Sequence, residues 1–312
     1  MLIGMIIVSL FVLPIMSTSS AAPLIIVEDT SLSDIIAADK IVVAMDAAYP
    51  PFENLVDEEI VGFDVDIMQY IADELEVELE IKNVAWDTIF TGLSSGTYDC
   101  ICSAVTITPE RNETMDFTRW YYTSTQAVMV GMDNRKNITG VDMIDAEGIK
   151  IGFQIGTTSQ WYLDDETSNC ELKSYDTITL AIQALKSGAV HAVLGDYATL
   201  YSGKISNPDS FAIIDTFSPE DFGIVFPKNS TAAVTRFNEV LDDLLGTDLE
   251  DPTFSADYIS THKKWMFDAE PTTEYTVDPV PEPKASIPGF SILGIICIIP
   301  LAAIPIIKKM RK

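Results

Sequence analysis

Hydrophobic and polar positions alternate in short blocks along most of the chain. Segments with apolar residues at helical spacing lie between apolar runs, as in residues 63–75, where Phe63, Ile67 and Ile71 share one face. Strands that alternate with helices indicate an α/β fold with a mostly parallel sheet. The predicted strands are 41–45, 77–81, 100–105, 126–130, 149–153, 171–175, 191–194, 211–214 and 222–227.

The predicted helices separate these strands and divide them into two groups. A second α/β unit begins after residues 137–140, so two lobes with a cleft between them are expected, and such clefts are favoured ligand sites. The chain would cross between the lobes near 130–131 and 221–223. The predicted helices are 63–75, 86–93, 177–186 with a threonine cap, 232–245, and one helix or a pair over 251–266; shorter helices begin after Thr157 and at Gly195-Asp196.

Both ends of the chain differ from this pattern. Residues 1–16 are almost wholly apolar and the next six are small, which is typical of a signal peptide cut near Ala22. No Lys or Arg precedes the apolar run, so an uncleaved anchor stays open. The predicted segments are 1–22 signal peptide, 23–40 N-terminal linker, 41–130 lobe 1, 131–222 lobe 2, 223–267 return to lobe 1, 268–286 acidic Pro/Thr linker, 287–307 transmembrane segment, and 308–312 basic cytoplasmic tail.

Composition narrows the function. The chain has 312 residues and a net charge of −28, which argues against a nucleic-acid partner. The cysteines lack metal-ligand spacing and the two histidines are far apart, so neither a zinc site nor a Ser/His/Asp triad is indicated, and no cofactor is expected. Cys100 and Cys102 would share one face of a strand and pack as small hydrophobes. A disulfide from either of them to Cys170 stays open.

Polar residues at the ends of predicted strands suggest a ligand site in the cleft. The strand 100–105 runs into Thr106 and Arg111, and an arginine fork suits a carboxylate. The alternative for Arg111 is helix capping or a surface ion pair with Glu113. Thr157 and Thr158 begin a helix whose free N–H groups attract a carboxylate, and Asp196 follows a strand where it would accept bonds from an ammonium group. Helix capping is the alternative for these three residues.

Six motifs occur in an order that resembles a known family. They are Y-P-P-F-E, G-F-D-V-D-I-M, D-C-I-C-S-A-V-T-I-T-P-E-R, M-D-F-T, Q-I-G-T-T-S and F-G-I-V-F-P-K. Together, over about residues 41–266, they resemble the extracytoplasmic amino-acid-binding proteins of ABC importers, the family 3 solute-binding proteins. The resemblance implies a two-lobed periplasmic-binding-protein type 2 fold, each lobe a mostly parallel sheet flanked by helices. It also implies two hinge crossings, closure on a free L-amino acid, and delivery to an ABC permease.

The resemblance further implies a role for each residue of the site. Tyr49 and Trp86 would be aromatic walls, and Asp46 and Gln154 would read the tip of the side chain. Asp46 favours Arg, Lys, His or Gln over an acidic ligand. The implied set is Arg111, Thr106, Thr157 and Thr158 for the carboxylate, Asp196, Ser103 and the carbonyl of Ala104 for the ammonium, and Asp46, Tyr49, Trp86 and Gln154 for the side chain.

The C-terminal segment resembles a sorting signal. Residues 288–290, Pro-Gly-Phe, precede the apolar span and the basic cluster, as in the PGF-type signals of archaeal surface proteins, which an archaeosortase removes and replaces with a lipid. A permanent single-span membrane anchor is the alternative, and in both cases the binding domain lies outside the cell. Asn112, Asn137 and Asn229 begin acceptor sequons for N-glycosylation.

Two other functional classes stay open. An enzyme on the same fold, such as a cyclohexadienyl dehydratase, would need a general acid in the cleft, for which Asp46 or Glu53 can be nominated. A ligand-sensing domain of a membrane receptor complex is the other alternative. Only five residues follow the predicted span, so signalling would require a separate membrane partner.

Overall fold

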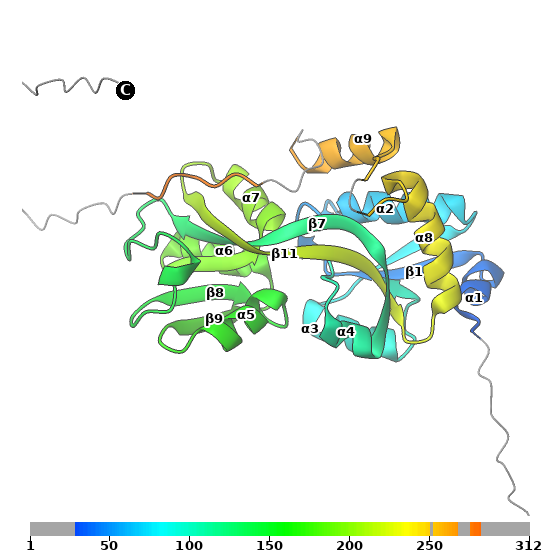
Figure 1. The fold of residues 1–312 in the computed structure, drawn as a ribbon, viewed down its shortest axis with the longest axis horizontal. Coiled ribbons are helices and arrows are strands. Elements are labelled where there is room, and N and C mark those ends of the chain that lie inside the picture. Colours follow the sequence, from blue (N-terminus) through cyan, green and yellow to red (C-terminus); the bar gives the residue numbers. More distant parts are fainter. Residues whose placement is uncertain (1–28, 250–251, 268–274, 282–312) are drawn as a thin grey trace, which may run out of the picture.

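The computed structural model describes residues 29–249, 252–267 and 275–281, which form two lobes joined by a pair of long strands (Figure 1). These strands are β7 (Met115–Gly131) and β11 (Phe211–Pro227), which pair antiparallel along most of their length. One eight-stranded sheet runs through both lobes in the order β5-β1-β6-β11-β7-β10-β8-β9. The two lobes are therefore continuous through the middle of the sheet.

Lobe 1 is built on β1 (Lys40–Met45), a mostly buried strand that pairs in parallel with two neighbours. A small antiparallel sheet of three short strands follows β1 and carries the loop with both prolines. The other elements of lobe 1 are α1 (Ser31–Ala37), β2 (Ala48–Tyr49), β3 (Glu53–Val56), β4 (Glu59–Val61), α2 (Phe63–Glu74), β5 (Glu78–Asn83), α3 (Trp86–Ser94), β6 (Cys100–Ile101), α4 (Pro109–Thr114), α8 (Thr231–Leu245) and α9 (Ala256–Trp265).

Lobe 2 repeats the alternation of strands and helices. Its strand β8 pairs in parallel with both β9 and β10, and β10 pairs antiparallel with β7. Thr177 caps α6 by accepting a hydrogen bond from the Leu180 N–H, as the sequence predicts. The elements of lobe 2 are η1 (Val141–Met143), β8 (Lys150–Gln154), α5 (Thr158–Glu166), β9 (Glu171–Tyr175), α6 (Ile178–Ser187), β10 (Ala192–Asp196) and α7 (Tyr197–Ile205).

The predicted fold class is confirmed. The sheet is parallel at β5-β1-β6 and at β10-β8-β9, and helices flank it in both lobes (Figure 1). The antiparallel exceptions are β7 and β11 in the middle, which connect the lobes. This is an α/β fold with a mostly parallel central sheet.

One predicted strand is much shorter than expected. The sequence predicts a strand over residues 100–105, but β6 ends at Ile101. Ala104 has a φ of 47°, outside the β region, and its N–H donates to Asp64 Oδ2 at 2.8 Å. The apolar run is buried as predicted. At the edge of the sheet where the site lies, however, the N–H of Ala104 binds the Asp64 side chain and not a neighbouring strand.

Other predicted strands are parts of longer ones. The prediction at 126–130 covers only the end of β7, and those at 211–214 and 222–227 are both parts of β11. β7 pairs with β10 of lobe 2 from Gln126 onward, so the chain enters lobe 2 earlier than the predicted crossing at 130–131. A strand that continues from one lobe into the other has no turn residues at the crossing. This explains why the sequence places the crossing too late in the chain.

The segment predicted as a linker contacts lobe 2. Residues 275–281, which we call the strap, run along lobe 2 as the orange segment of Figure 1. Asp278 binds Lys204 at 2.6 Å, and it exchanges two hydrogen bonds with the backbone of Ile213. Tyr275 donates its hydroxyl to a backbone carbonyl of β7 at 2.5 Å. The strap therefore contacts both of the strands that connect the lobes, and lobe 2 itself.

Several predictions concern residues that the structure does not describe. The signal peptide at 1–22, the apolar span at 287–307, the basic tail at 308–312 and Cys297 all lie outside the described residues. Among the residues that are described, no helix is long and apolar enough to cross a membrane. Within the same residues Cys100, Cys102 and Cys170 are free, so neither of the two possible disulfides to Cys170 is formed there.

Candidate functional site

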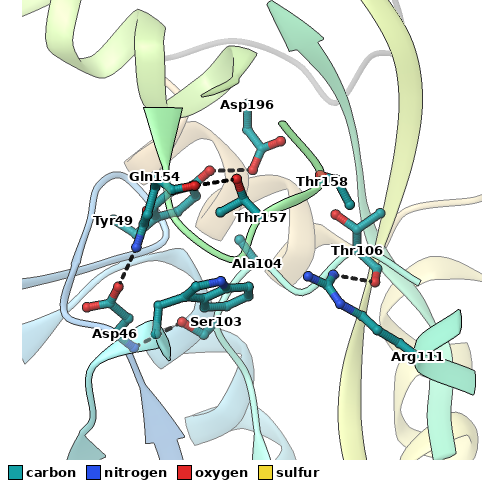
Figure 2. Close-up of a pocket in the computed structure, with 11 residues that line it drawn as sticks. Asp46, Tyr49, Ser103, Ala104, Thr106, Arg111, Gln154, Thr157, Thr158 and Asp196 are labelled. Carbon is teal, nitrogen blue, oxygen red and sulfur yellow. Dashed lines mark hydrogen bonds between the residues drawn. The ribbon is translucent and has the colours of Figure 1, made fainter. Parts of the chain in front are cut away.

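The residues singled out from the sequence line one pocket between the lobes (Figure 2). Most of them stand at or just beyond the carboxyl ends of β1, β6, β8 and β10, whereas Tyr49 lies on β2, Trp86 begins α3 and Arg111 lies in α4. The pocket is lined by Asp46, Tyr49, Trp86, Ser103, Ala104, Thr106, Arg111, Gln154, Thr157, Thr158 and Asp196. All eleven residues named for the site in the sequence analysis are therefore brought together.

Arg111 is buried at one end of the pocket. It lies in the first turn of α4, which starts at Pro109 after Thr108 as N-cap, and its side chain and backbone together are only 6% exposed. Its Nη1 donates to the carbonyl oxygen of Thr106 at 2.9 Å (Figure 2). A guanidinium buried in this way is no surface ion-pair partner, so the alternative pairing with Glu113 on the surface is wrong.

Aromatic rings and carboxylates surround the Arg111 guanidinium. Its carbon lies 5.6 Å from the ring centroid of Trp86, 5.3 Å from that of Phe90 and 4.9 Å from that of Trp161, within the range of cation–π attraction. Burial lowers the pKa of Arg111 to about 10, and the negative charges of nearby carboxylates oppose that shift. Arg111 therefore stays cationic at neutral pH and can bind an anion in a poorly hydrated place.

The backbone between β6 and Thr106 is held by buried side chains. Ser103 Oγ accepts the N–H of Asp46 at 3.0 Å and donates to Glu53 Oε1 at 2.6 Å. Asp64 accepts the N–H of Ala104, as described above. Burial raises the pKa of Glu53 well above its usual value, and the neighbouring Asp64 charge adds to this. The backbone beside the pocket is thereby fixed in its unusual conformation.

Asp196 does not cap the helix that it precedes. It is the N-cap residue of α7, but its side chain makes no capping hydrogen bond. Instead its two oxygens accept hydrogen bonds from Tyr49 Oη at 2.5 Å and Gln126 Nε2 at 2.6 Å. The capping alternative is therefore wrong for Asp196, whose carboxyl group is buried at the junction of the two lobes.

Thr157 caps α5, whereas Thr158 is its first residue. Thr157 Oγ1 accepts the N–H of Gln160 at 3.4 Å and donates to the carbonyl of Gln154 at 2.8 Å. Thr158 Oγ1 accepts a long bond from Gln126 Nε2 at 3.4 Å. The capping alternative is thus confirmed for Thr157, and the helix N-terminus with its positive dipole end lies at the pocket.

Asp46 and Gln154 meet at another side of the pocket, from different lobes. Gln154 Nε2 donates to Asp46 Oδ2 at 2.9 Å (Figure 2). Burial raises the pKa of Asp46 to about 6, while the hydrogen bond from Gln154 acts in the opposite direction. Asp46 is therefore mostly a carboxylate at neutral pH and suits a cationic or hydrogen-bond-donating group.

Tyr49 and Trp86 form walls of the pocket and also join the lobes. Trp86 Nε1 donates to the carbonyl of Gly156 in lobe 2 at 3.1 Å, and the Tyr49 hydroxyl binds Asp196 as described above. Beyond these, Thr179 Oγ1 in lobe 2 donates to the carbonyl of Ala48 at 3.2 Å. Hydrogen bonds therefore connect the lobes at several points around the pocket.

One protein-family model matches most of the described chain. Residues 41–250 match the family model of bacterial extracellular solute-binding proteins, family 3. The chain belongs to this family. The match includes every residue of the pocket, from Asp46 to Asp196, and ends before α9 and the strap.

Relatives of this solute-binding protein include transport proteins of known ligand. It is 32% identical over 211 residues to ABC transporter arginine-binding protein 1 of Escherichia coli strain K12, covering 66% of this chain and 85% of that protein. It resembles the crystal structures of the arginine-, lysine- and histidine-binding protein ArtJ from Geobacillus stearothermophilus, with a TM-score of 0.66 and 32% identity, covering 74% of this chain and 96% of ArtJ. The ancestral amino-acid-binding protein AncCDT-1, a precursor of cyclohexadienyl dehydratase, gives a TM-score of 0.68 at 27% identity, covering 76% and 99%.

Sequence reasoning missed three residues around the pocket of this solute-binding protein. Gln126 bridges Asp196 and Ser159, because its Nε2 donates to the first and its Oε1 accepts from the second. Trp161 stacks over Arg111 from lobe 2, and Glu220 accepts the hydroxyl hydrogen of Thr106 at 2.7 Å. Gln126 and Glu220 lie inside the long strands β7 and β11, and neither follows the carboxyl end of a predicted strand or begins a predicted helix.

In the residues that the structure describes, no group of three or more His, Cys, Asp or Glu side chains is placed to hold a metal ion. The carboxyl groups near the pocket instead bind donors of the protein itself. What the pocket offers to a ligand is a buried cation at one end and buried carboxylates elsewhere.

Proposed function

We propose that this protein captures a free L-amino acid with a cationic or amide side chain and delivers it to the permease of an ABC importer. One observation carries the proposal. A buried cation, Arg111, and a buried carboxyl group, Asp196, line the same pocket, while Asp46 lines it as a third charged group. The family and the amino-acid-binding relatives support this assignment.

The backbone end of the ligand would occupy the Arg111 and Asp196 side of the pocket. Arg111, Thr106, Thr157 and Thr158 offer a cation, hydroxyls and a helix N-terminus to the α-carboxylate. Asp196, with Ser103 and the carbonyl of Ala104, offers acceptors to the α-ammonium. A zwitterion that loses its hydration needs partners of this kind for both charges, because an unpaired buried charge is costly.

The side chain of the ligand would lie between Tyr49 and Trp86 and reach toward Asp46 and Gln154. The carboxylate of Asp46 attracts a guanidinium, an ammonium or an amide N–H, and it repels an acidic side chain. ArtJ, an arginine-, lysine- and histidine-binding protein, has ligands of this chemistry. Closure of the lobes would be driven by the ligand, which would bind the closed form more tightly than the open form.

Calorimetric titration of residues 23–281 with single amino acids tests this proposal. Arginine, lysine, histidine and glutamine are expected to bind, with glutamate much weaker. Agmatine, which is arginine without its carboxylate, is the matched probe for Arg111. It should bind much more weakly than arginine. Equal binding of agmatine and arginine, or tighter binding of glutamate than of glutamine, would overturn the assignment.

We also propose that the C-terminal segment tethers the binding domain to the outer face of the membrane. The support is the sequence alone, with the Pro-Gly-Phe motif at 288–290, the apolar run at 287–307 and the basic residues at 308–312. Mass spectrometry of the mature C-terminus from native membranes separates a retained span from a cut and lipidated end. A full-length chain recovered in the soluble fraction would contradict both forms of anchoring.

An enzyme of the cyclohexadienyl dehydratase type is the second candidate function. Asp46 favours it, because a carboxyl group in the pocket with a pKa of about 6 can act as a general acid near neutral pH. AncCDT-1, one of the similar structures, is itself an amino-acid-binding precursor of such an enzyme. A turnover assay with prephenate and arogenate decides between the two, and no product is expected.

A further inference from the structure

The strap, residues 275–281, is bound to the fold at both of its ends. Near its start the Tyr275 hydroxyl donates to the carbonyl of Thr123 at 2.5 Å, on the stretch of β7 that runs between the lobes. At its end the carbonyl of Pro281 accepts a hydrogen bond from Asn134 Nδ2 at 3.2 Å. Asn134 lies just beyond β7, so the strap follows this strand to the end of lobe 2 that is farthest from lobe 1 (Figure 1).

The middle of the strap binds lobe 2 through Asp278. Its N–H donates to the carbonyl of Ile213 at 2.6 Å, while its carboxylate accepts the Ile213 N–H at 2.8 Å and pairs with Lys204 Nζ at 2.6 Å. The side chains of Asp278 and Lys204 are only 28% and 23% exposed, so water screens this ion pair less than a pair on the open surface. Val280 adds apolar contact with the core of lobe 2. Charged, polar and apolar groups thus all bind the strap to lobe 2.

The length of chain after the strap decides how far the fold can lie from a membrane anchor. Five residues, 282–286, separate Pro281 from the predicted span at 287–307, and fully extended they reach about 17 Å at roughly 3.3 Å per residue. Without the strap contacts, the last attachment of the chain would be α9 on lobe 1, which ends at Trp265. The 21 residues 266–286 would then reach about 70 Å, which would leave the orientation of the lobes open.

We propose that the strap attaches the C-terminal tether to lobe 2, and that the end of lobe 2 around Asn134 faces the lipid headgroups of the membrane. This proposal rests on the tethering in the proposed function. Residues 282–286 hold this end within their short reach of the headgroups, whereas lobe 1 lies beyond lobe 2 along the long axis of the molecule (Figure 1). The attachment comes from residues that lie outside the match to the family model.

This orientation keeps the pocket away from the headgroups. β10 pairs antiparallel with β7, with Ala192 opposite Val130 and Asp196 opposite Gln126. The end of β7 beside Asn134 is therefore next to the amino end of β10, and the pocket residue Asp196 stands at the other end of that strand. Lobe 2 itself then lies between the headgroups and the pocket, so the membrane surface does not cover the place where a ligand binds.

Energy transfer to an acceptor on lipid headgroups tests this orientation. The full-length chain is reconstituted in phosphatidylcholine vesicles that contain acceptor-labelled lipid, with one fluorescent amino acid as donor. Position 147 reports on the end of lobe 2, because Glu147 is exposed and the adjacent Gly148 lies beside the Lys136 side chain, in the loop of Asn134. Position 37, where Ala37 is exposed on α1, reports on lobe 1. Transfer should be strong from position 147, and most of it should be lost at position 37. Equal transfer, or stronger transfer from position 37, would overturn the proposal.

Two insertions of the same length separate the position of the strap from the total length of the tether. About 20 Gly and Ser residues after Pro281 lengthen the flexible connection between the strap and the span. The same residues after Glu270 leave the connection at 282–286 unchanged. The insertion after Pro281 should lose most of the transfer from position 147, and the insertion after Glu270 should leave that transfer as it is in the unmodified chain. Equal losses with both insertions would show that the strap is not the attachment and would overturn the proposal.

A measurement without a membrane separates this proposal from the proposed tethering. The full-length chain in detergent carries the acceptor at position 286, in place of Ser286 just before the predicted span, and the donor at position 147 or 37. Transfer should again be much stronger from position 147, and equal transfer from the two positions would overturn the attachment to lobe 2. If the chain fails to float with vesicles but transfer in detergent favours position 147, the tethering and the membrane-facing surface fail together, and the attachment of the C-terminal segment to lobe 2 stands.

Discussion

Burying the charged residues of the pocket costs free energy, and the charge of each buried group indicates what it binds. Arg111 has lost most of its contact with water and donates to the backbone carbonyl of Thr106. Figure 2 shows its guanidinium beside the pocket, on the side of Thr106. A guanidinium can form two parallel bonds with a carboxylate, which a backbone carbonyl does not provide. The arrangement is explained if part of this capacity serves the α-carboxylate of a ligand.

Replacement of Arg111 by alanine should weaken the binding of every amino acid by a similar amount. The loss is expected to be about 2 to 5 kcal/mol, because a buried carboxylate is left without its cation. Titration calorimetry with arginine and with glutamine checks this, since the two ligands share the carboxylate and differ in the side chain. Arg236→Ala, on α8 and paired with Glu239, is the control and should bind normally. A loss confined to arginine would show that Arg111 does not bind the common end of the ligands.

Asp46 should make the preference for a cationic side chain depend on pH. Its pKa is raised to about 6, so the carboxyl group takes up a proton as the pH falls through that value and no longer attracts a cation. The ratio of arginine affinity to glutamine affinity is therefore expected to fall between pH 7 and pH 5. Taking the ratio cancels any effect at the shared ammonium end.

Asp46→Asn provides the matched control for this pH dependence. The variant keeps the size of the side chain but cannot change its charge, so the affinity ratio should be low and flat over the same range. Titrations at three pH values with both ligands suffice. A ratio that falls equally in the wild type and in Asp46→Asn would assign the pH dependence to another group.

At the scale of the elements, local sequence pattern predicts the helices and strands that are determined by residues close together in the chain. The helix α6 with its cap at Thr177 and the strand β9 at Glu171–Tyr175 follow from residues close together in the sequence. The backbone conformation just after β6 does not, because the N–H of Ala104 there donates to Asp64, some forty residues earlier in the chain. Elements next to the site depart from their pattern where a distant side chain replaces a backbone partner.

The strap is the other element that sequence pattern does not reveal. Residues 268–286 are poor in apolar residues, yet Val280 packs against the core of lobe 2 and Asp278 binds the backbone of β11. The binding partners of an extended segment lie elsewhere in the chain, so its composition alone predicts a linker. The strap extends the fold beyond the residues that match the family model.

Asp278→Ala should destabilise lobe 2 without affecting the pocket directly. The variant loses the ion pair with Lys204, which is partly exposed, and the hydrogen bond from the Ile213 N–H. The expected cost is about 1 to 2 kcal/mol of the free energy of unfolding. Chemical denaturation measures it, and Asp165→Ala, an exposed residue of α5, is the control. Equal stability of the wild type and Asp278→Ala would show that the strap contacts do not stabilise the fold.

At the scale of the whole molecule, the two lobes are predictable and their connection is not. Two α/β units in sequence predict two lobes, and the motifs supply residues of the pocket from both. The residues that join the lobes at the pocket, such as Gln126 and Glu220, lie on the two strands shared by both lobes. Their role depends on which groups meet when the lobes face each other, which no local spacing encodes.

Tyr49 connects the two lobes directly and therefore tests the mechanism of closure. Its ring is a wall of the pocket, and its hydroxyl donates to Asp196, which belongs to the other lobe. Tyr49→Phe keeps the ring and removes only this hydrogen bond. If closure on the ligand depends on contacts of this kind, the affinities for arginine and glutamine should both fall, by about 1.5 to 3 kcal/mol or about 10-fold to 150-fold, because the bond ends on a carboxyl group.

The two ligands separate closure from recognition of the side chain. Because the Tyr49 hydroxyl binds Asp196 and not the side-chain end of the pocket, Tyr49→Phe should leave the ratio of arginine to glutamine affinity unchanged. Small-angle scattering with saturating arginine should still show a decrease in the radius of gyration, at a higher arginine concentration than the wild type needs. A changed ratio with unchanged scattering would mean that Tyr49 reads the ligand side chain, and the closing contacts would then have to be sought at Trp86 and Gly156, which join the lobes on another side of the pocket.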